Sequence, residues 1–302
     1  MTYSCPPPQW LACQRMGAMP PLHGSCGNGQ LSGYGLPAKP APMTYKVAAF
    51  YQFTALADFR AFREPLRARC AGLKLKGSVL LAGEGINGTL AGTPEAIDAL
   101  IAELEHGALF GGRLDRLELK FSTAQAMPFG RLKIRLKKEI VTLGDATCDP
   151  TRQVGVYIEP SEWNALIAAE DTLLIDTRNA FEVEMGTFEG AIDPKIASFG
   201  QFKDFVAEKL DPARHRRIAM FCTGGIRCEK ASSHLLARGF AEVYHLKGGI
   251  LKYLEEIDEA DSRWRGACFV FDERVALGHG LKESPRTQAA QNQPLREQIC
   301  HE

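Results

Sequence analysis

The fold of the second half of the chain follows from one segment, residues 218–231, which reads IAMFCTGGIRCEKA. An apolar run typical of a buried strand ends at Cys222, the pair Gly224 and Gly225 permits a tight turn, and a helix is predicted to follow. In an open parallel sheet, ligands bind just beyond the carboxyl ends of the strands. The segment therefore predicts a functional loop that starts at Cys222.

This loop is suited to hold an anion. Backbone N–H groups that point into a tight loop create a positive site together with the N-terminus of the following helix. The Cys222 thiolate is the anion that the sequence supplies, and a thiol pKa lowered from ~8.5 toward neutrality makes cysteine a nucleophile. The guanidinium of Arg227, at the rim, adds to this effect. The supporting residues are expected to be Thr223, Gly224, Gly225, Ile226 and Arg227.

This hypothesis requires Cys222 to be both ionised and reachable by a substrate. A thiol as unreactive as free cysteine, or one buried away from solvent, would contradict it. The alternative that the residues leave open is a passive thiol at the end of a buried strand, with the glycine pair as a plain turn, because cysteine is often buried.

The spacing within the loop resembles one known family. Four residues separate Cys222 from Arg227, one fewer than in the phosphoryl-binding loop of phosphatases. The smaller ring resembles the active loop of rhodanese domains, in which the cysteine carries a terminal sulfur as a persulfide. The resemblance continues through LIDTR at 174–178, GTFEGA at 186–191 and VYHLKGG at 243–249. It implies an α/β rhodanese domain over residues 161–263.

The pattern around the loop agrees with this domain. Strands are expected at 172–176, 217–222 and 242–246, and helical segments near Phe181 and at 199–210, 229–238 and 250–257. Strands separated by helices form a parallel sheet. Asp176 and Arg178 end the first of these strands near the same sheet edge, so we expect them to brace the loop, with Glu182 as a partner.

The first half of the chain has a different pattern. Strands at 47–53, 78–82, 89–91 and 117–121 and helices at 57–70 and 94–106 give the order β-α-β-β-α-β, which is the ferredoxin-like α+β unit. Thr93 is expected to cap the helix that starts at Pro94. The turn between the middle strands is expected to use Gly83, Gly85, Asn87 and Gly88.

The flanking segments are expected to lack a core. Residues 1–42 contain eight Pro, six Gly and no Asp or Glu, so they cannot bury enough apolar surface to offset their ordering entropy. We predict a disordered extension over 1–42, a functional start at Met43, a first domain over 43–143, a linker over 144–160 and a largely irregular C-terminal extension over 264–302.

Composition excludes several classes of protein. The chain has 302 residues, of which 45% are hydrophobic and 24% charged, as in a soluble globular protein of two domains. Its apolar runs are too short to span a bilayer, so no membrane association is expected. Nine cysteines without a C-x-x-C pair favour a reduced, cytoplasmic compartment and no metal site.

Basic and acidic side chains are distributed unevenly between the two halves of the chain. Residues 43–143 carry 15 basic and 10 acidic side chains, whereas residues 144–302 carry 19 and 26. In the basic part, Arg131, Lys133, Arg135 and Lys137 alternate with apolar residues, so a strand there would present four cations on one face. Such a face either protects an edge strand or follows a phosphate backbone, and the residues alone favour the first of these.

A narrower resemblance covers the chain from Tyr45 to about Gly280. It is carried by EGINGT at 84–89, DTRN at 176–179, CTGGIRCEK at 222–230 and CFVFDER at 268–274. These blocks resemble the oxygen-dependent tRNA uridine hydroxylases, which join an acylphosphatase-like domain to a rhodanese domain. Many members continue into a Cys-rich module, whereas this chain has only Cys300 there. The resemblance implies formation of 5-hydroxyuridine at the wobble position of tRNA, with molecular oxygen as co-substrate, Cys222 required and RNA held by the basic first domain.

We therefore expect a tRNA-modifying oxidoreductase in which Cys222 adds to the uracil ring. Cys228 is a candidate resolving thiol, or it fills space. No flavin, haem or iron motif is evident, so no cofactor is expected, and no stable protein partner is predicted. The second hypothesis is a rhodanese-type persulfide sulfurtransferase, which the loop fits equally well. A non-catalytic binding module ranks last because Cys222 is present.

Overall fold

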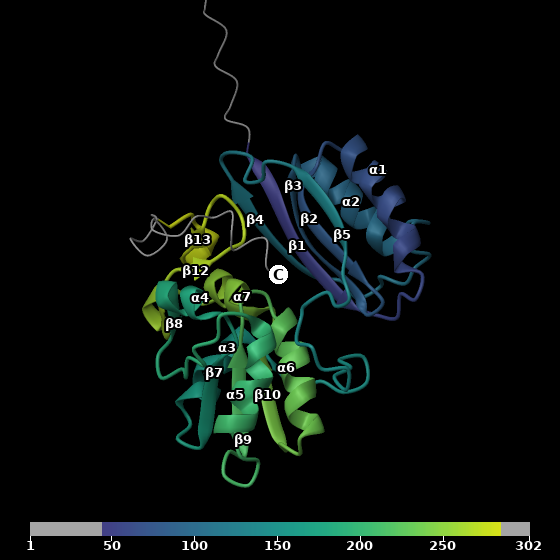
Figure 1. Ribbon diagram of the computed structural model, residues 1–302. Coiled ribbons are helices and arrows are strands. Elements are labelled where there is room, and N and C mark those ends of the chain that lie inside the picture. Colours follow the sequence, from purple (N-terminus) through teal and green to yellow (C-terminus); the bar gives the residue numbers. More distant parts are fainter. Residues whose placement is uncertain (1–43, 285–302) are drawn as a thin grey trace, which may run out of the picture. The chain divides into compact units, whose positions relative to one another are not determined.

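The computed structural model describes residues 44–284, and the predictions for residues 1–42, Met43 and the end of the C-terminal extension lie outside this range. Residues 44–284 form a five-stranded sheet and then a four-stranded sheet (Figure 1). Among these residues, none of the helices has the length and apolar character that crossing a bilayer requires.

The first sheet confirms the expected α+β unit. Its strands are β1 (Tyr45–Phe53), β2 (Lys76–Ala82), β3 (Gly85–Gly92), β4 (Glu118–Ala124) and β5 (Leu132–Leu136), in the order β4-β1-β3-β2-β5. β1 pairs with β3 and β4 in antiparallel fashion, and β5 joins β2 in parallel at the edge. β5 is the strand that the alternation of cations and apolar residues indicated.

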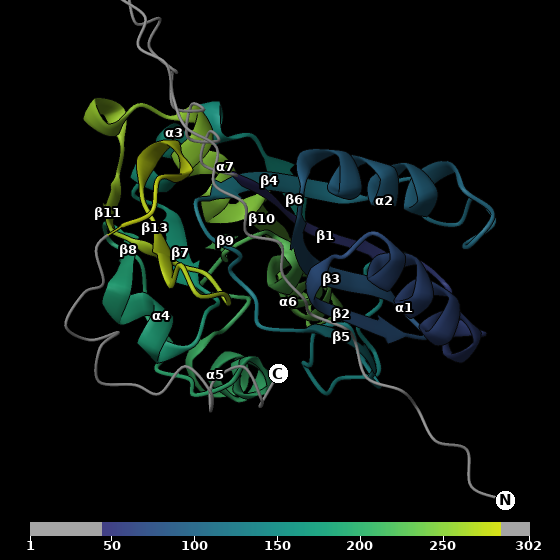
Figure 2. The ribbon, with the colours of Figure 1, turned by 90° about the horizontal axis from the view of Figure 1, so that it is seen from above.

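Two helices cover one face of this sheet (Figure 1, Figure 2). A 3-10 turn, η1 (Phe59–Phe62), precedes α1 (Arg63–Gly72), so the regular helix begins later than expected. α2 (Pro94–His106) has the expected bounds, and the Thr93 side chain accepts a hydrogen bond from the Ala96 N–H at 3.3 Å.

Alternation along β1 decides which side chains face away from the helices. Ala48 and Phe50 lie in the core beneath α1 and α2. Because successive side chains of a strand point to opposite faces, Tyr51 points from the sheet face that the helices leave open.

The expectation for the turn between the middle strands is partly wrong. Gly83 and Glu84 connect β2 to β3, whereas Asn87 and Gly88 lie inside β3. Gly88 is needed there for packing, since a Cβ atom would lie 2.7 Å from the Phe50 ring.

The second sheet is parallel, as predicted. Its strands are β6 (Val156–Ile158), β7 (Thr172–Asp176), β9 (Arg217–Phe221) and β10 (Glu242–Leu246), in the order β6-β10-β9-β7. The helices of this part are α3 (Pro160–Ala168), α4 (Ala180–Met185), α5 (Phe202–Lys209), α6 (Ile226–Ala237) and α7 (Gly249–Glu256).

Helices lie on both faces of the parallel sheet. α5 and α6 pack on one face, where Phe202 and Leu235 meet Ile218 of β9. α3 and α7 pack on the other face, where Trp163 and Ile250 meet Phe221. β9 is therefore an inner strand that is covered on both sides, and its carboxyl end opens onto the middle of the sheet edge.

Several short elements were not expected from the sequence. β6 lies within residues 144–160, the segment predicted as a linker, and pairs with β10. β8 (Gly186–Phe188) pairs with β11 (Trp264–Gly266), and β12 (Cys268–Phe269) pairs with β13 (Ala276–Leu277). The remaining 3-10 turns are η2 (Phe199–Gln201), η3 (Glu259–Asp261) and η4 (His279–Leu281). Elements of two or three residues are too short to show a hydrophobic period.

Candidate active site

The loop after β9 connects the strand to α6 and is held from one side by α7. β9 ends one residue before Cys222, and α6 begins at Ile226. The first amides of α7 bond to the loop carbonyls, with Ile250 N–H to Cys222 O at 2.9 Å and Leu251 N–H to Thr223 O at 3.1 Å. The loop backbone is thus fixed by the helix that follows β10.

Hydrogen-bond donors surround the Cys222 sulfur. The Gly225 N–H donates to Sγ at 3.1 Å, and this orientation depends on a φ of 104° that favours glycine. Burial raises the pKa of the Cys222 thiol, but the Cys228 thiol, the Arg227 charge and the Cys228 and Gly225 amides together lower that pKa to about 6. The hydrogen-bond donors and the Arg227 charge therefore lower the Cys222 pKa by more than burial raises it.

Cys268 provides an internal comparison. Both Cys222 and Cys268 have no exposed surface. Burial raises the pKa of Cys268 to about 12, whereas the pKa of Cys222 is lowered to about 6. Equal burial with opposite shifts means that the loop donors, and not burial, decide the ionisation of Cys222.

The hypothesis for Cys222 requires an ionised and a reachable thiol, and this conformation does not meet the second requirement: the side chain is 0% exposed, so the expectation of direct access is wrong and a reaction at Cys222 requires the loop to open. Besides α7, Tyr51 of β1 covers the loop: a Cβ atom on Gly225 would lie 2.9 Å from the Tyr51 hydroxyl oxygen. This contact joins residues 174 positions apart in the chain, so local sequence patterns do not reveal it.

We expect the Cys222 thiol to titrate with a midpoint at about pH 6. Its thiolate, detected by ultraviolet absorbance, should persist at neutral pH and disappear as the pH falls through this midpoint, because protonation removes the anion that the loop stabilises. The difference between wild type and Cys222→Ser isolates the signal, with Cys268→Ser as the matched control. A midpoint near the ordinary thiol value of ~8.5 would contradict the proposed loop electrostatics.

Arg227 is held by a carboxylate from the opposite side of the loop. Its two terminal nitrogens donate to the two Glu182 oxygens at 2.7 and 2.8 Å, and both side chains are buried. Arg227 also donates to the Thr223 hydroxyl at 3.3 Å. Burial raises the pKa of Glu182, but the Arg227 charge and hydrogen bonds lower it overall. The carboxylate fixes the guanidinium beside the loop.

The predicted bracing pair forms a separate unit. Arg178 Nε and one terminal nitrogen donate to Asp176 at 2.9 and 2.6 Å, and the guanidinium also donates to the Glu182 and Gly186 carbonyls. The Glu182 carboxylate itself binds Arg227. Asp176 and Arg178 therefore support the backbone of α4, while Glu182 supports the loop side chain.

Cys228 lies in the first turn of α6, where its thiol is next to that of Cys222. It is buried, it interacts with Cys222 through a thiol hydrogen bond, and the Thr177 hydroxyl is 3.6 Å from its sulfur. Burial, followed by the interaction with Cys222, raises the pKa of Cys228 well above its ordinary value. The pair thus consists of an acidic thiol and a neutral thiol.

Sequence reasoning missed two residues of the same helical turn, Glu229 and Lys230. The Tyr51 hydroxyl donates to Glu229 Oε1 at 2.7 Å. Lys230 Nζ pairs with Glu84 at 2.9 Å, with Glu139 and with the Val141 carbonyl. A lysine near the N-terminus of a helix is unfavourable because the helix dipole is positive there. Its presence in the sequence is therefore a signal that carboxylates from other segments pair with it.

The alternation of cations and apolar residues around β5 places the two kinds of side chain on opposite faces of the strand, as predicted. Leu132, Ile134 and Leu136 pack against the first core, so Lys133 and Arg135 point to the other face of β5. This is the same open face from which Tyr51 projects. Arg131 and Lys137 flank the strand.

Three potential metal ligands lie together at the far part of α6. The ligand atoms of Asp145, Cys148 and His234 are within 4.8 Å of one another. Asp145 Oδ2 is 2.7 Å from His234 Nδ1 and also accepts from Arg238 at 3.2 Å. The Arg238 guanidinium already supplies positive charge to Asp145, so these three residues are best described as a polar cluster that links the segment before β6 to α6.

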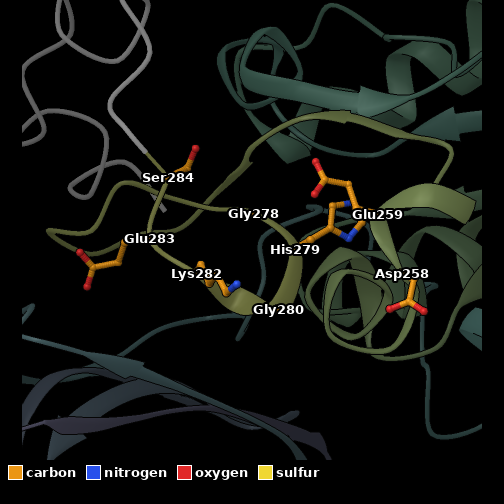
Figure 3. A pocket seen from close by; sticks show the side chains of 8 residues that line it. All are labelled: Asp258, Glu259, Gly278, His279, Gly280, Lys282, Glu283 and Ser284. Atoms are coloured by element: carbon orange, nitrogen blue, oxygen red, sulfur yellow. The ribbon is translucent and has the colours of Figure 1, made fainter.

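A pocket of about 410 Å³ lies between the segment of Asp258 and Glu259 and residues 278–284 (Figure 3). Its lining includes His279 and Lys282 but no residue of the loop 222–227. It is therefore separate from the thiol site.

Comparisons with known proteins match both parts of the chain. Residues 45–140 match the family described as the UPF0176 acylphosphatase like domain, and residues 159–256 match the rhodanese-like domain. These matches confirm the predicted fold class.

Curated relatives extend over most of the chain. A protein of Bradyrhizobium diazoefficiens named tRNA uridine(34) hydroxylase is 82% identical over 238 residues, which are 79% of this chain and 93% of that protein. Proteins with the same name from Nitrobacter hamburgensis and Teredinibacter turnerae are 76% identical (80% of this chain, 94% of that protein) and 56% identical (79% and 73%).

Proposed function

Because the chain belongs to the family of tRNA uridine(34) hydroxylases, we propose that it hydroxylates C5 of uridine 34 in tRNA, with molecular oxygen as co-substrate and Cys222 as nucleophile. The product is 5-hydroxyuridine. The observation that carries the role of Cys222 is the hydrogen bond that the Gly225 N–H donates to Sγ at 3.1 Å in the loop before α6. The lowered pKa of this thiol, against the raised pKa of the equally buried Cys268, accords with it.

The chemistry requires a thiolate and a way to steady it. Addition of Sγ to C6 of uracil uses the sulfur lone pair and moves the C5–C6 π electrons toward C5 and the C4 carbonyl. C5 then becomes the electron-rich carbon that attacks a peroxide, formed from O2 by a two-electron reductant such as a cellular dithiol. The C5–O bond forms, the O–O bond breaks, and the second oxygen atom leaves as hydroxide, which becomes water. Before addition, the Gly225 amide and the Arg227 charge stabilise the thiolate.

Substrate access requires the loop to be uncovered. Cys222 is buried, and Tyr51 covers Gly225 and bonds to Glu229. The target base, flipped out of the anticodon, therefore reaches the sulfur only after the loop is uncovered, and we propose that the hydrogen bond between Tyr51 and Glu229 persists in that open state. Such gating is common in enzymes that exclude water from the reacting atoms.

Cys228 is proposed as the thiol that restores an oxidised Cys222. Because the pKa of Cys228 is raised, its thiol stays protonated in the resting enzyme, and a protonated thiol does not compete with the Cys222 thiolate for the substrate. A disulfide between Cys222 and Cys228, followed by reduction by a cellular dithiol, would return the thiolate.

Cations on the open face of the first sheet are proposed to hold the tRNA backbone. We expect the double variant Lys133→Gln, Arg135→Gln to weaken tRNA binding and to reduce the magnitude of its salt slope by about 0.7–0.9 for each phosphate that the protein no longer neutralises. Filter binding over a range of salt concentrations measures both quantities. Arg67→Gln in α1, an exposed cation on the helix-covered side, is the matched control. Equal effects of the two substitutions would argue against this RNA face.

The proposed function is tested by two assays on the same protein. Nucleoside analysis of tRNA from a deletion strain should show loss of 5-hydroxyuridine, and its return when the wild-type chain is supplied. The second hypothesis, a persulfide sulfurtransferase, predicts thiosulfate:cyanide activity with unchanged tRNA. Intact 5-hydroxyuridine in the deletion strain would overturn the hydroxylase proposal.

A further inference from the structure

The carboxyl group of Glu229 is the titratable side chain in the first turn of α6 that the reaction outlined above leaves without a role. Glu229 is 6% exposed, and its backbone N–H bonds to the Gly225 carbonyl at 3.3 Å. Its side chain accepts the hydrogen bond of the Tyr51 hydroxyl at 2.7 Å. The Tyr51 oxygen in turn lies over Gly225, whose amide binds the Cys222 sulfur. These contacts place the carboxyl group at the mouth of the thiol loop.

Four groups from different elements act on this carboxyl. Tyr51 of β1 and Tyr157 of β6 interact with it through hydrogen bonds, Glu118 of β4 through its charge, and Cys222 through the thiolate charge. Burial is the largest effect, and the two negative charges add to it, so that the pKa of Glu229 is raised to about 7 in spite of the tyrosines. Glu229 therefore exchanges a proton close to neutral pH.

The neighbouring tyrosine and arginine side chains cannot exchange a proton close to neutral pH. Burial and the charge of Glu229 raise the pKa of both Tyr51 and Tyr157. Arg227 remains charged at any working pH. Among the described residues at the loop mouth, a neutral-pH base is thus available at Glu229.

We propose that Glu229 is the general base that removes the C5 proton from the oxygenated nucleobase, and that Tyr51 positions its carboxylate for this step. The inference rests on the proposed function. In the adduct, C6 carries Cys222 Sγ, and C5 carries the new hydroxyl group and one hydrogen. The C5 proton moves to a Glu229 carboxylate oxygen, the C5–H electron pair forms the C5–C6 double bond, and the C6–S pair returns to sulfur. The step yields 5-hydroxyuridine and the Cys222 thiolate, and it consumes no oxidant.

Glu229→Gln separates formation of the adduct from its release. Glutamine keeps an oxygen that accepts the Tyr51 hydrogen bond, but it cannot take up the proton. We expect 5-hydroxyuridine formation to fall by about 10²–10⁴-fold, and a denaturation-resistant complex of tRNA with Cys222 to accumulate on gels. Glu162→Gln, an exposed glutamate in the first turn of α3, should behave as wild type.

A tRNA with 5-fluorouridine at position 34 controls for the earlier step. It has no C5 proton to remove, so wild type and Glu229→Gln should trap it to the same extent. Equal trapping shows that the variant folds, binds tRNA and still adds Cys222. If Glu229→Gln forms product at the wild-type rate, or loses product without accumulating the adduct, the role of Glu229 as base is refuted.

Tyr51→Phe tests the positioning role through the pH profile. The Tyr51 hydrogen bond lowers the Glu229 pKa, so its removal should shift the rising limb at about pH 7 to higher pH. In Glu229→Gln this limb should vanish. An unmoved limb in Tyr51→Phe would overturn the positioning role. Absence of 5-hydroxyuridine and of trapping with the wild-type protein would instead refute the proposed function itself.

Discussion

Cys222→Ser is expected to reduce 5-hydroxyuridine in tRNA by roughly 10⁴-fold or more, because a serine hydroxyl remains protonated where the thiol is ionised. The loop that stabilises the thiolate cannot lower the pKa of an alcohol far enough to replace it. Nucleoside analysis of tRNA from cells that carry the variant as their single copy measures the effect. The tRNA affinity should stay close to that of wild type, since the substitution removes no cation.

A matched substitution distinguishes this result from a general sensitivity to cysteine replacement. Cys268→Ala alters a thiol with the same complete burial, but one whose pKa is raised. It should leave hydroxylation within a few-fold of wild type. Persistent 5-hydroxyuridine with Cys222→Ser would show that the nucleophile lies elsewhere.

Glu182→Gln is expected to lower the free energy of unfolding by about 3–5 kcal/mol, the range found when one partner of a buried ion pair is removed. Glu182 is 0% exposed and binds both terminal nitrogens of Arg227. An amide can accept one of these bonds but carries no charge, so the guanidinium would remain buried without compensation. Urea unfolding followed by circular dichroism measures the change.

An exposed pair supplies the comparison for this effect. Glu189 lies 2.6 Å from Arg265, and both side chains are about half exposed. Glu189→Gln should therefore cost no more than about 1 kcal/mol. Similar decreases for the two variants would mean that the bond to Arg227 contributes little to stability.

The elements that position the thiol could be predicted because their signals are local. An apolar run before Cys222 and a helix after Gly225 are both visible in one short segment, and β9 and α6 follow it closely. The cap at Thr93 is equally local, since its partner lies three residues away. Patterns of this kind decided the fold class and the place of the thiol.

The contacts that shape the site could not be predicted in the same way. Tyr51 and Glu229 are 178 positions apart, and no periodicity in β1 marks one tyrosine for a bond to α6. Glu182 was expected to join Arg178, but its carboxylate pairs with Arg227 because the two meet only in the folded chain. The sequence predicts Gly88 as a turn residue, but it lies inside β3, since the space that Phe50 requires is a tertiary property.

The complete burial of Cys222 has a further consequence for the proposed oxygen-dependent reaction. Thiolates in contact with the solution are converted by peroxide to sulfinic and sulfonic acids, which cellular reductants do not reverse. Cys222 is ionised yet lies out of reach of the solution. We therefore expect peroxide to oxidise Cys222 more slowly than an exposed thiolate of the same pKa.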